Sequence, residues 1–508
     1  MTDKKVRVRF APSPTGPLHM GGVRTALYNY LFAKKHGGDF LLRIEDTDQT
    51  RFVPGAEEYI MKSLEWCGIR VDEGINEGGD FGPYRQSERK DIYQKYTKQL
   101  IDGGFAYYAF DSAEELDAYR KAAEEKKETF TYNPATRGNL KNSLALNAEE
   151  VAKRIEAGEA YVVRFKMPEA DDVVMQDIIR NEVKVNTATL YDKVLFKSDG
   201  LPTYHLANIV DDHLMEITHV IRGEEWLPSL PLHVLLYKAL GWESTMPEFA
   251  HLPLLLKPTG NGKLSKRDGD KLGFPVFPLF WKAPNGDTAS GYREEGYFAD
   301  AFVNLLALLG WNPGTEQEVF SMEELIQEFS LERVTKSGSK FDPKKAEWFN
   351  HQYMVQKSNA ELAKAFKPVL EENRVSTNDA IIERVIGMIK ERANFVKDFW
   401  GQAAFFFKTP EEYDAKTVKK RWKENTPALM ADIKDILAKV EDFSAANAKA
   451  AVSAYIEEKE LGFGSIMNAL RLAVVGAAMG PDLFEIIEIV GQEQSVARIE
   501  KAINEIKR

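Results

Sequence analysis

The sequence predicts a Rossmann-like α/β fold, a doubly wound parallel sheet that carries an inserted α+β domain and is followed by an all-α rear half. Three observations predict it. Strand-like and helix-like segments alternate at the start of the chain, as in a parallel sheet covered by helices. After about residue 107 the pattern changes to charged helix mixed with short alternating runs, which indicates an insertion. From about Ala299 nearly every segment has helical periodicity.

The individual elements follow from local patterns. Gly37 and Gly38 end the first helix, because glycine readily takes the left-handed φ that closes helices. We interpret TYHLANIVDD and EITHVIRGEEW as further parallel-sheet strands. Residues 273–296 are rich in Gly, Pro and aromatics, so we expect a long ordered loop or hairpin there. The predicted strands are 6–10 and 40–44, and the predicted helices are 23–36, 55–67, 86–101, 113–127 and 231–240.

Length, charge and cysteine content narrow the class of protein. A chain of 508 residues is too long for one compact core and predicts about three or four domains. The net charge of −11 disfavours indiscriminate polyanion binding, but a local basic face that recognises one RNA is compatible with it. Cys67 is the only cysteine, which excludes an internal disulfide and a cysteine-rich zinc site.

Targeting and membrane signals are lacking in the sequence. The N-terminal segment MTDKKVRVRF has no apolar core of the kind that a signal peptide needs. The longest purely apolar stretch near the C-terminus, residues 472–479, is too short to cross a bilayer. We therefore expect a cytoplasmic location and no membrane partner.

The segment PSPTGPLHMGG, residues 12–22, lies between the first predicted strand and the first predicted helix. Backbone N–H groups and the helix dipole at such a junction favour phosphate. The prolines fix φ, while Gly21 and Gly22 let a ligand approach the backbone. His19 and free amide groups at the helix start therefore suit the oxygens of a triphosphate. The alternative is a proline-rich connection with a surface histidine.

The pentapeptide KLSKR, residues 263–267, follows the buried-looking run HLPLLL and ends in Arg-Asp-Gly. A mobile loop that carries Lys263 and Lys266 can close on a triphosphate. There it would neutralise the charge that develops at the α-phosphorus and on the leaving pyrophosphate. The alternative is a lysine-rich surface loop.

Six segments together resemble one family. PSPTGPLHMGG is similar to the HIGH motif of class I aminoacyl-tRNA synthetases in its glutamyl form, and KLSKR is similar to their KMSKS motif. FLLRIEDTD, GPYRQSER, SDGLPTYHLANIVDDH and HVIRGEEWLPS also resemble segments of bacterial glutamyl-tRNA synthetases, in the order of that family. The matches cover nearly the whole catalytic half, whereas the rear half is similar mainly in composition and length.

The resemblance implies a pocket for glutamate. Glu45 is expected to hold the substrate ammonium, and Arg9 and Arg222 its side-chain carboxylate. Arg222 is expected to set specificity, because a guanidinium that faces a neutral amide loses a charge-assisted hydrogen bond worth about 1.5–3 kcal/mol. The implied glutamate-binding residues are Arg9, Ala11, Ser13, Glu45, Tyr204, Asn208 and Arg222.

The resemblance also implies an ATP site. Glutamate is itself the nucleophile, so catalysis rests on positioning and electrostatics by His19, Lys263 and Lys266. Mg²⁺ is expected to accompany ATP. The implied ATP-binding residues are His19, Gly21, Gly22, Glu225, Leu254 and Lys266.

Each of these residues also has a purely structural interpretation. Glu45 can cap a helix, Tyr204 can be a core residue, and the two arginines can pair with Asp46 or Glu224. Without the family motifs, these interpretations are the more common ones.

The inserted segment departs from the family at one place. Some members carry a zinc site near the position of residues 107–111. Here that stretch reads YYAFD and the insertion contains no cysteine, so we predict no structural zinc.

The resemblance implies that two parts of the chain bind tRNA. The inserted segment is expected to meet the acceptor end and the helical rear half the anticodon. Arg392 lies where discriminating bacterial members place an anticodon-reading arginine. KTVKKRWK, residues 416–423, is a candidate phosphate and stacking patch, and a charged helix face accounts for it equally well.

We therefore expect a monomeric glutamate–tRNA ligase that joins L-glutamate to tRNA(Glu) by way of glutamyl-adenylate. A glutaminyl-tRNA synthetase is the nearest alternative, disfavoured by Arg222 and by the helical rear half. A non-catalytic nucleotide-binding regulator is disfavoured by the intact His19, Lys263 and Lys266. The predicted domains are a split catalytic domain at 1–107 and 197–272, an acceptor-binding insertion at 108–196, a stem-contact region at 273–338 and an anticodon-binding domain at 339–508.

Overall fold

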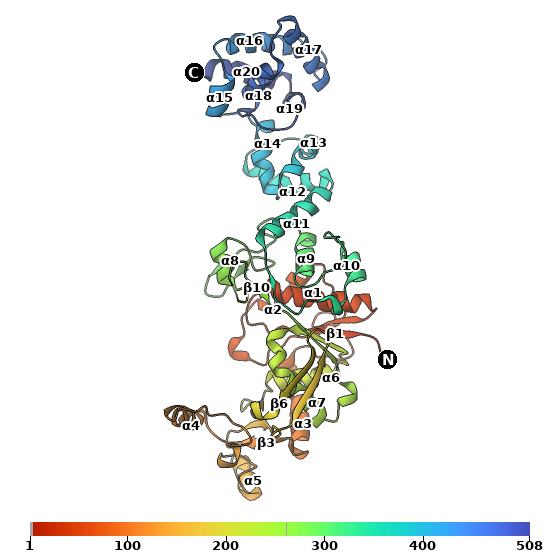
Figure 1. Ribbon diagram of the computed structural model, residues 1–508, viewed down its shortest axis with the longest axis vertical. Helices are drawn as coiled ribbons and strands as arrows, with labels where there is room; N and C mark the ends of the chain where they lie inside the picture. Colours follow the sequence, from red (N-terminus) through yellow and green to blue (C-terminus); the bar gives the residue numbers. More distant parts are fainter. Residues whose placement is uncertain (1–3, 261, 508) are drawn as a thin grey trace. The chain divides into compact units, whose positions relative to one another are not determined.

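The computed structural model describes residues 4–260 and 262–507, without the side chains of Lys266, Arg267 and Asp270. The chain forms two compact units, Met1–Ala346 and Glu347–Arg508 (Figure 1). Within the described ranges, no helix has both the length and the apolar character needed to pass through a bilayer.

Two neighbouring β-sheets lie at the centre of the first unit. One consists of β1 (Arg7–Phe10) and β2 (Asp39–Leu42). The other has the order β6 (Asn181–Asn186), β5 (Asp172–Asp177), β9 (Glu248–Leu252) and β8 (His219–Gly223). β1 pairs with β2, and β9 pairs with β5 and β8, in parallel, whereas β6 is an antiparallel edge strand beside β5. Thr218 joins the two sets of strands, because its N–H donates to the Arg7 carbonyl at 2.9 Å. The predicted parallel α/β sheet is confirmed, with an antiparallel hairpin added at one edge.

Helices pack around these two sheets and against one another. They are α1 (Met20–Lys35), α2 (Ala56–Trp66), α3 (Lys90–Asp102), α6 (Tyr204–Leu214), α7 (Leu230–Ala239), α9 (Ala299–Leu308) and α10 (Met322–Glu328). α1 begins after its N-cap residue His19 and ends in Lys34 and Lys35, where cations suit the negative end of the helix dipole. Its Tyr28 hydroxyl donates to the Ala307 carbonyl at 2.9 Å, which ties α1 to α9. The middle of α1 is therefore bound to α9.

One predicted strand is wrong. The segment TYHLANIVDD forms most of helix α6, although its apolar and β-branched residues favour a strand locally. Asn208, Asp211 and Asp212 recur at the i, i+3 and i+4 spacing that puts side chains on one helical face. Asp211 accepts from Arg89 at 2.7 Å and Asp212 from Arg43 at 2.8 Å. These buried pairs with distant residues select the helix.

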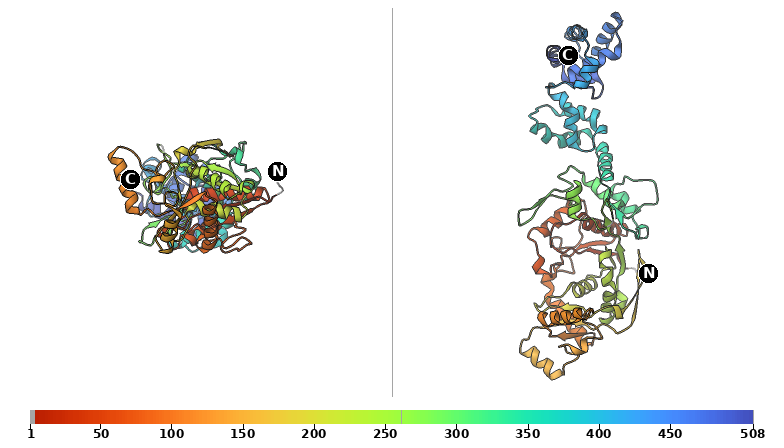
Figure 2. Two further views of the ribbon diagram at one scale, coloured as in Figure 1. Left: turned by 90° about the horizontal axis from the view of Figure 1, so that it is seen from below. Right: turned by 60° about the vertical axis from the view of Figure 1, so that its left-hand side comes forward.

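The inserted segment builds a three-stranded antiparallel sheet with flanking helices. Its elements are β3 (Ala106–Ala109), α4 (Ala113–Glu125), α5 (Ala148–Glu156), β4 (Val162–Phe165) and β7 (Val194–Phe196). Figures 1 and 2 show α4 and α5 at the end of the first unit that lies away from α9. In the stretch YYAFD, Tyr107 donates to Asp192 at 2.5 Å, and Asp111 accepts from Tyr132 at 3.0 Å. Among the described residues no group of His, Cys, Asp and Glu is arranged to hold a metal ion, and the lack of a zinc site stays a prediction.

Residues 273–296 form the expected hairpin. The remaining elements of the first unit are β10 (Leu255–Leu256), α8 (Lys266–Leu272), β11 (Trp281–Lys282), β12 (Thr288–Ala289) and β13 (Ser339–Lys340). β11 and β12 are antiparallel, and β10 pairs in parallel with β13. The Val276 carbonyl accepts the Met20 N–H at 2.9 Å, so this segment supports the start of α1.

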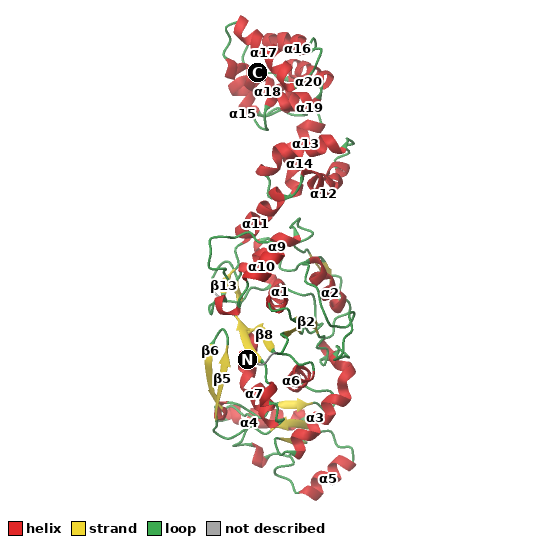
Figure 3. Ribbon diagram, turned by 90° about the vertical axis from the view of Figure 1, so that its right-hand side faces the viewer, coloured by secondary structure: helices red, strands yellow, loops and turns green. Residues whose placement is uncertain are grey.

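The described residues of the second unit form helices joined by loops, without a strand (Figure 3). Its helices are α12 (Asn359–Glu372), α13 (Asp379–Ile389), α14 (Phe399–Phe407), α15 (Ala415–Arg421), α16 (Thr426–Leu437), α17 (Ala445–Glu458), α18 (Phe463–Val475), α19 (Leu483–Val490) and α20 (Gln492–Glu505), while α11 (Pro343–Gln356) contains the boundary between the units. The predicted all-α rear half is confirmed. Trp422 is only 2% exposed, so of the two interpretations of residues 416–423 the stacking patch loses its aromatic side chain. The lysines of residues 416–423 are exposed, which fits a charged helix face.

Candidate active site

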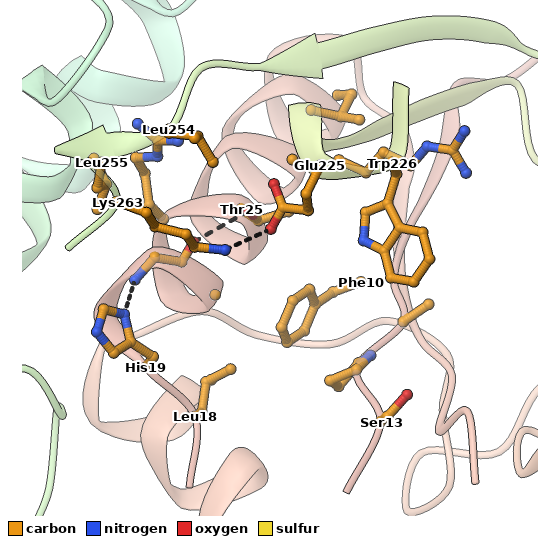
Figure 4. Close-up of a pocket in the computed structure, with 18 of the residues that line it drawn as sticks. Phe10, Ser13, Leu18, His19, Thr25, Glu225, Trp226, Leu254, Leu255 and Lys263 are labelled. Carbon is orange, nitrogen blue, oxygen red and sulfur yellow. Dashed lines mark hydrogen bonds and ion pairs between the residues drawn. The ribbon is translucent and has the colours of Figure 1, made fainter. Parts of the chain in front are cut away.

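Residues of PSPTGPLHMGG and of KLSKR line the same pocket, whose volume is about 380 Å³ (Figure 4). Small-molecule pockets usually measure about 300–1,000 Å³. The pocket lies where β1 and β8 end and α1 begins, which is where open α/β sheets bind ligands. Folding therefore brings the proline-stiffened turn and the distant lysine segment to one cavity.

Most of the predicted site residues line this pocket. They are Arg9, Ala11, Ser13, His19, Gly21, Gly22, Glu45, Tyr204, Asn208, Arg222, Glu225, Leu254 and Lys263. Two predicted residues are not among them. The side chain of Lys266 lies outside the described part of the structure. Arg392 belongs to the second unit, where it is exposed in the short turn η8 (Lys390–Arg392).

His19 is a partly buried, neutral residue at the start of α1. Its Nδ1 accepts the N–H of Gly21 at 3.2 Å. Burial, and to a smaller extent the ammonium group of Lys263, lower the pKa of His19 to about 4. A neutral ring whose Nδ1 accepts a hydrogen bond carries its proton on Nε2. Nε2 is buried without a hydrogen-bond partner among the described residues, so the N–H of His19 lacks an acceptor there.

The expectation of free amide groups at the start of α1 is wrong. The Met20 N–H donates to Val276, the Gly21 N–H to the His19 ring, and the Gly22 N–H to the His19 carbonyl at 2.8 Å. The N–H groups of the first turn are therefore used within the protein. An anion at this end of the pocket is left with the helix dipole, the imidazole N–H and the nearby lysine.

Lys263 and Glu225 form an ion pair on the pocket wall. The distance between Lys263 Nζ and Glu225 Oε1 is 3.1 Å, and Figure 4 shows the two side chains reaching toward each other. The neighbouring Glu224 is bound elsewhere, because it accepts from Arg180 at 2.6 Å and from the Leu254 N–H at 2.9 Å. Glu224 is therefore not the partner of a pocket arginine.

Arg222 is a buried cation without an acidic partner among the described residues. Its Nη1 donates to the Tyr204 hydroxyl at 2.9 Å and lies 3.3 Å from His233 Nδ1, and its Nε donates to His251 Nε2 at 3.0 Å. No described carboxylate forms a salt bridge with it, and its Nη2 is buried without a partner in the described ranges. Burying an uncompensated charge is costly. A ligand carboxylate is the group that this environment lacks.

Glu45 and Arg9 lie against a buried charge network. Arg43, which is fully buried, donates to Glu45 at 2.9 Å and to Asp212 at 2.8 Å. Asp212 also accepts the Arg9 Nε at 3.0 Å, and Asn208 donates to Glu45 at 3.3 Å. Burial raises the pKa of Glu45, although the guanidinium groups of Arg43 and Arg9 oppose the shift. The partner of Arg9 is thus Asp212 rather than Asp46.

Sequence reasoning missed several side chains of this site. Trp226 lines the pocket and packs against the Tyr204 ring, with ring centroids 4.2 Å apart. Thr25 follows the glycine pair within α1 and also lines the pocket. Trp226 lies within the segment HVIRGEEWLPS and Thr25 lies shortly after PSPTGPLHMGG, so their closeness to these motifs could have identified them as pocket residues. Arg43 lies within the segment FLLRIEDTD and His251 begins the run HLPLLL, but nothing in either pattern shows that the two side chains support the pocket from behind.

Comparison with known proteins agrees with this geometry. Residues 5–348 match the family described as tRNA synthetases class I (E and Q), catalytic domain. Residues 361–503 match a family described as anticodon binding domain.

Relatives that match this chain over nearly its full length are named glutamate–tRNA ligase. A glutamate–tRNA ligase of Flavobacterium johnsoniae is 61% identical over 99% of both chains, and one of Porphyromonas gingivalis is 59% identical over 99% of both. A crystal structure of a glutamate tRNA ligase from Elizabethkingia meningosepticum in complex with its amino acid matches with a TM-score of 0.97 and 54% identity, over 99% of this chain and 100% of that one. This chain belongs to the glutamate–tRNA ligase family of class I aminoacyl-tRNA synthetases.

Proposed function

We propose that this enzyme joins L-glutamate to tRNA(Glu) in two steps. The α-carboxylate of glutamate attacks the α-phosphate of ATP, which gives glutamyl-adenylate and pyrophosphate. A hydroxyl of the 3′-terminal ribose of the tRNA then attacks the adenylate carbonyl and releases AMP. The observation that carries the choice of amino acid is the buried guanidinium of Arg222, which has no carboxylate partner among the described residues.

In this proposal the glutamate side chain points toward Arg222. The γ-carboxylate accepts from the unpartnered Nη2 of Arg222, and Tyr204 steadies the guanidinium. The substrate ammonium faces the carboxylate of Glu45, whose Oε1 is already held by Arg43. Arg9 adds positive charge on the same side. Ala11, Ser13 and Asn208 shape the remaining wall.

ATP occupies the end of the pocket near α1. The N–H on His19 Nε2 and the ammonium of Lys263 are donors for its phosphate oxygens, and Lys266 joins them from the KLSKR segment. Gly21 and Gly22 leave room beside the phosphates, and Leu254 and Glu225 lie toward the nucleoside. Mg²⁺ bound to ATP would neutralise part of the phosphate charge, beside the ammonium of Lys263 and the N–H of His19.

The remaining predictions concern tRNA and organisation. The domains 1–107 with 197–272, 108–196, 273–338 and 339–508 serve catalysis, acceptor-end binding, stem contact and anticodon binding, respectively. The exception is the hairpin of β5 and β6, which lies within 108–196 but belongs to the sheet of β8 and β9 and serves catalysis. Arg392 reads the anticodon. Support for this comes from its exposure and from the neighbouring Arg471, whose pKa is lowered mainly by burial and also by the charge of Arg392. The enzyme acts as a cytoplasmic monomer and has no membrane partner.

Aminoacylation assays test this function. Purified tRNA(Glu) and tRNA(Gln) are each incubated with ATP and with radiolabelled glutamate or glutamine. We expect glutamate, and not glutamine, to be attached to tRNA(Glu). Transfer of glutamine would favour a glutaminyl-tRNA synthetase. Failure of ATP–pyrophosphate exchange in the presence of glutamate and tRNA would favour a nucleotide-binding regulator.

A further inference from the structure

A line of buried polar side chains runs behind Arg222. It begins at Asp177, the last residue of β5, and passes through His251 on β9. Asp177 Oδ2 lies 2.6 Å from His251 Nδ1, and His251 Nε2 lies 3.0 Å from Arg222 Nε. The side chains of Asp177 and His251 are both 0% exposed. Water therefore does not compete for these hydrogen bonds.

The hydrogen bonds fix the tautomer of His251. The Nε–H of an arginine can only donate, so His251 Nε2 has to accept. The proton of the neutral ring is then on Nδ1, which donates to Asp177. Burial lowers the pKa of His251 and the hydrogen bond to His251 helps to keep the pKa of Asp177 low, which agrees with a neutral imidazole beside a carboxylate. The negative charge of Asp177 is thus separated from the Arg222 guanidinium by the neutral ring of His251.

We propose that Asp177 and His251 are positioning residues that hold the Arg222 guanidinium in the orientation that receives the γ-carboxylate of glutamate. This inference rests on the role proposed above for Arg222. A carboxylate in direct contact with Arg222 would occupy the place of the substrate. The histidine keeps Asp177 one ring away, so the guanidinium is oriented but not neutralised.

The remaining contacts of Arg222 do not replace this one. Tyr204 and His233 both meet Nη1 on one arm of the guanidinium. His251 binds Nε, at the base of the group. Two points of attachment define the plane in which Nη2 lies, whereas one arm alone lets the group rotate.

The surroundings of Asp177 make one substitution unusually informative. Asp177 Oδ1 accepts the backbone N–H groups of Ile179 at 3.0 Å and Arg180 at 2.7 Å. In Asp177→Asn the amide oxygen has to remain at that position, so the amide NH₂ turns toward His251 Nδ1. The ring then carries its proton on Nε2, and this N–H opposes the Nε–H of Arg222. The variant keeps the local turn and reverses only the tautomer.

The test compares four variants of the full-length enzyme by ATP–pyrophosphate exchange with tRNA(Glu) present. Asp177→Asn is expected to raise KM for glutamate on the order of tenfold and to leave KM for ATP unchanged. His251→Gln places an amide oxygen near the former Nε2 and should lie closer to the wild type. In the His251→Gln background, Asp177→Asn should cost little more, because no tautomer is left to reverse. Arg222→Ala serves as the reference for a lost guanidinium.

Three results would overturn the inference. One is an unchanged KM for glutamate in Asp177→Asn while Arg222→Ala raises it. Another is an equal rise in KM for ATP, and the third is an undiminished Asp177→Asn defect in the His251→Gln background. If Arg222→Ala also leaves KM for glutamate unchanged, the proposed function of the pocket fails instead.

A second comparison covers the case in which Asp177→Asn does not fold. His251→Leu removes the acceptor for Arg222 Nε, and His251→Gln retains one. We expect the Leu variant to show the larger KM for glutamate at equal Tm. Equal glutamate KM values in the two variants would contradict the positioning role.

Discussion

Lys263 Nζ lies 3.1 Å from Glu225 Oε1, so the lysine of the KLSKR segment forms an ion pair with a carboxylate of the pocket wall. The two side chains are 58% and 44% exposed. Ion pairs with this exposure contribute little to stability and exchange readily with other charges. A triphosphate carries far more negative charge than one carboxylate and is expected to take over Lys263 when it binds.

Lys263→Met is therefore expected to slow adenylate formation. The variant loses a cation beside the developing phosphate charge, and loss of one such group usually costs about 10²–10³-fold in rate. ATP–pyrophosphate exchange with tRNA present measures this, while KM for glutamate should change little. Lys271→Met, in the exposed last turn of α8, is the matched control and should behave like the wild type.

The same variant provides a second readout. Removal of the Lys263 charge should raise the pKa of His19 from about 4, and burial, the larger cause, should keep it below 6.5. NMR titration of the imidazole measures the change. An unaltered His19 pKa would show that Lys263 does not act on the phosphate end of the pocket.

Gly21→Ala is expected to separate folding from nucleotide binding. A Cβ at this position would meet only His19 Nδ1 at 3.6 Å and Leu255 at 3.9 Å, which are ordinary contacts. Alanine in a helix is more stable than glycine by about 0.5–1 kcal/mol, so Tm should hold or rise. The added methyl group lines the pocket and should raise KM for ATP. A variant with unchanged KM for ATP would exclude close approach of the phosphates to this turn.

As the pH is lowered, binding of glutamate is expected to weaken at a higher pH than it would if Glu45 had the pKa of an exposed carboxylate. Burial raises the pKa of Glu45, so this group becomes protonated, and loses its attraction for the substrate ammonium, before an exposed glutamate does. The value of kcat/KM for glutamate reports ionisations of the free enzyme and should fall as pH drops through the raised pKa. In Glu45→Gln this acid limb should disappear and kcat/KM should be low at every pH. An acid limb that persists in Glu45→Gln would assign it to another group.

The sequence predicted those elements whose structure is determined by the pattern of their own residues. The strand before residue 12, the helix after the glycine pair and the helical rear half all carry their own hydrophobic period. Helix α6 was misread because its polar face is explained only by buried partners such as Arg43, which lies far away in the sequence. The burial of Trp422 has the same kind of cause, since it depends on tertiary packing that a charged local sequence does not reveal.

The pocket residues could be assigned because the motifs stand in a recognisable order, and the structure places most of them around one cavity. The residues that lie behind the pocket and hold its side chains in place could not be assigned from the sequence. Asp177 and His251 are 74 positions apart and meet only because β5 and β9 are neighbours in the sheet. The prediction of free amide groups at the start of α1 failed for a similar reason. The Met20 N–H donates to the carbonyl of Val276, which is far away in the sequence.

Arg392→Gln is expected to relax the choice of tRNA without changing activation of glutamate. The side chain is exposed in the second unit, so its loss should leave Tm unchanged. The ratio of kcat/KM for tRNA(Glu) to that for tRNA(Gln) is the measurement, and Lys449→Gln, exposed on α17, is the control. An unchanged ratio would remove Arg392 from anticodon recognition.

The most direct test of the account is the preference for glutamate over glutamine in Arg222→Ala. With tRNA(Glu) present, the ratio of kcat/KM for the two amino acids is measured in the variant and in the wild type, together with KM for ATP. We expect the ratio to fall by about tenfold or more and KM for ATP to stay the same. Retained discrimination in a folded variant would show that Arg222 does not read the glutamate side chain.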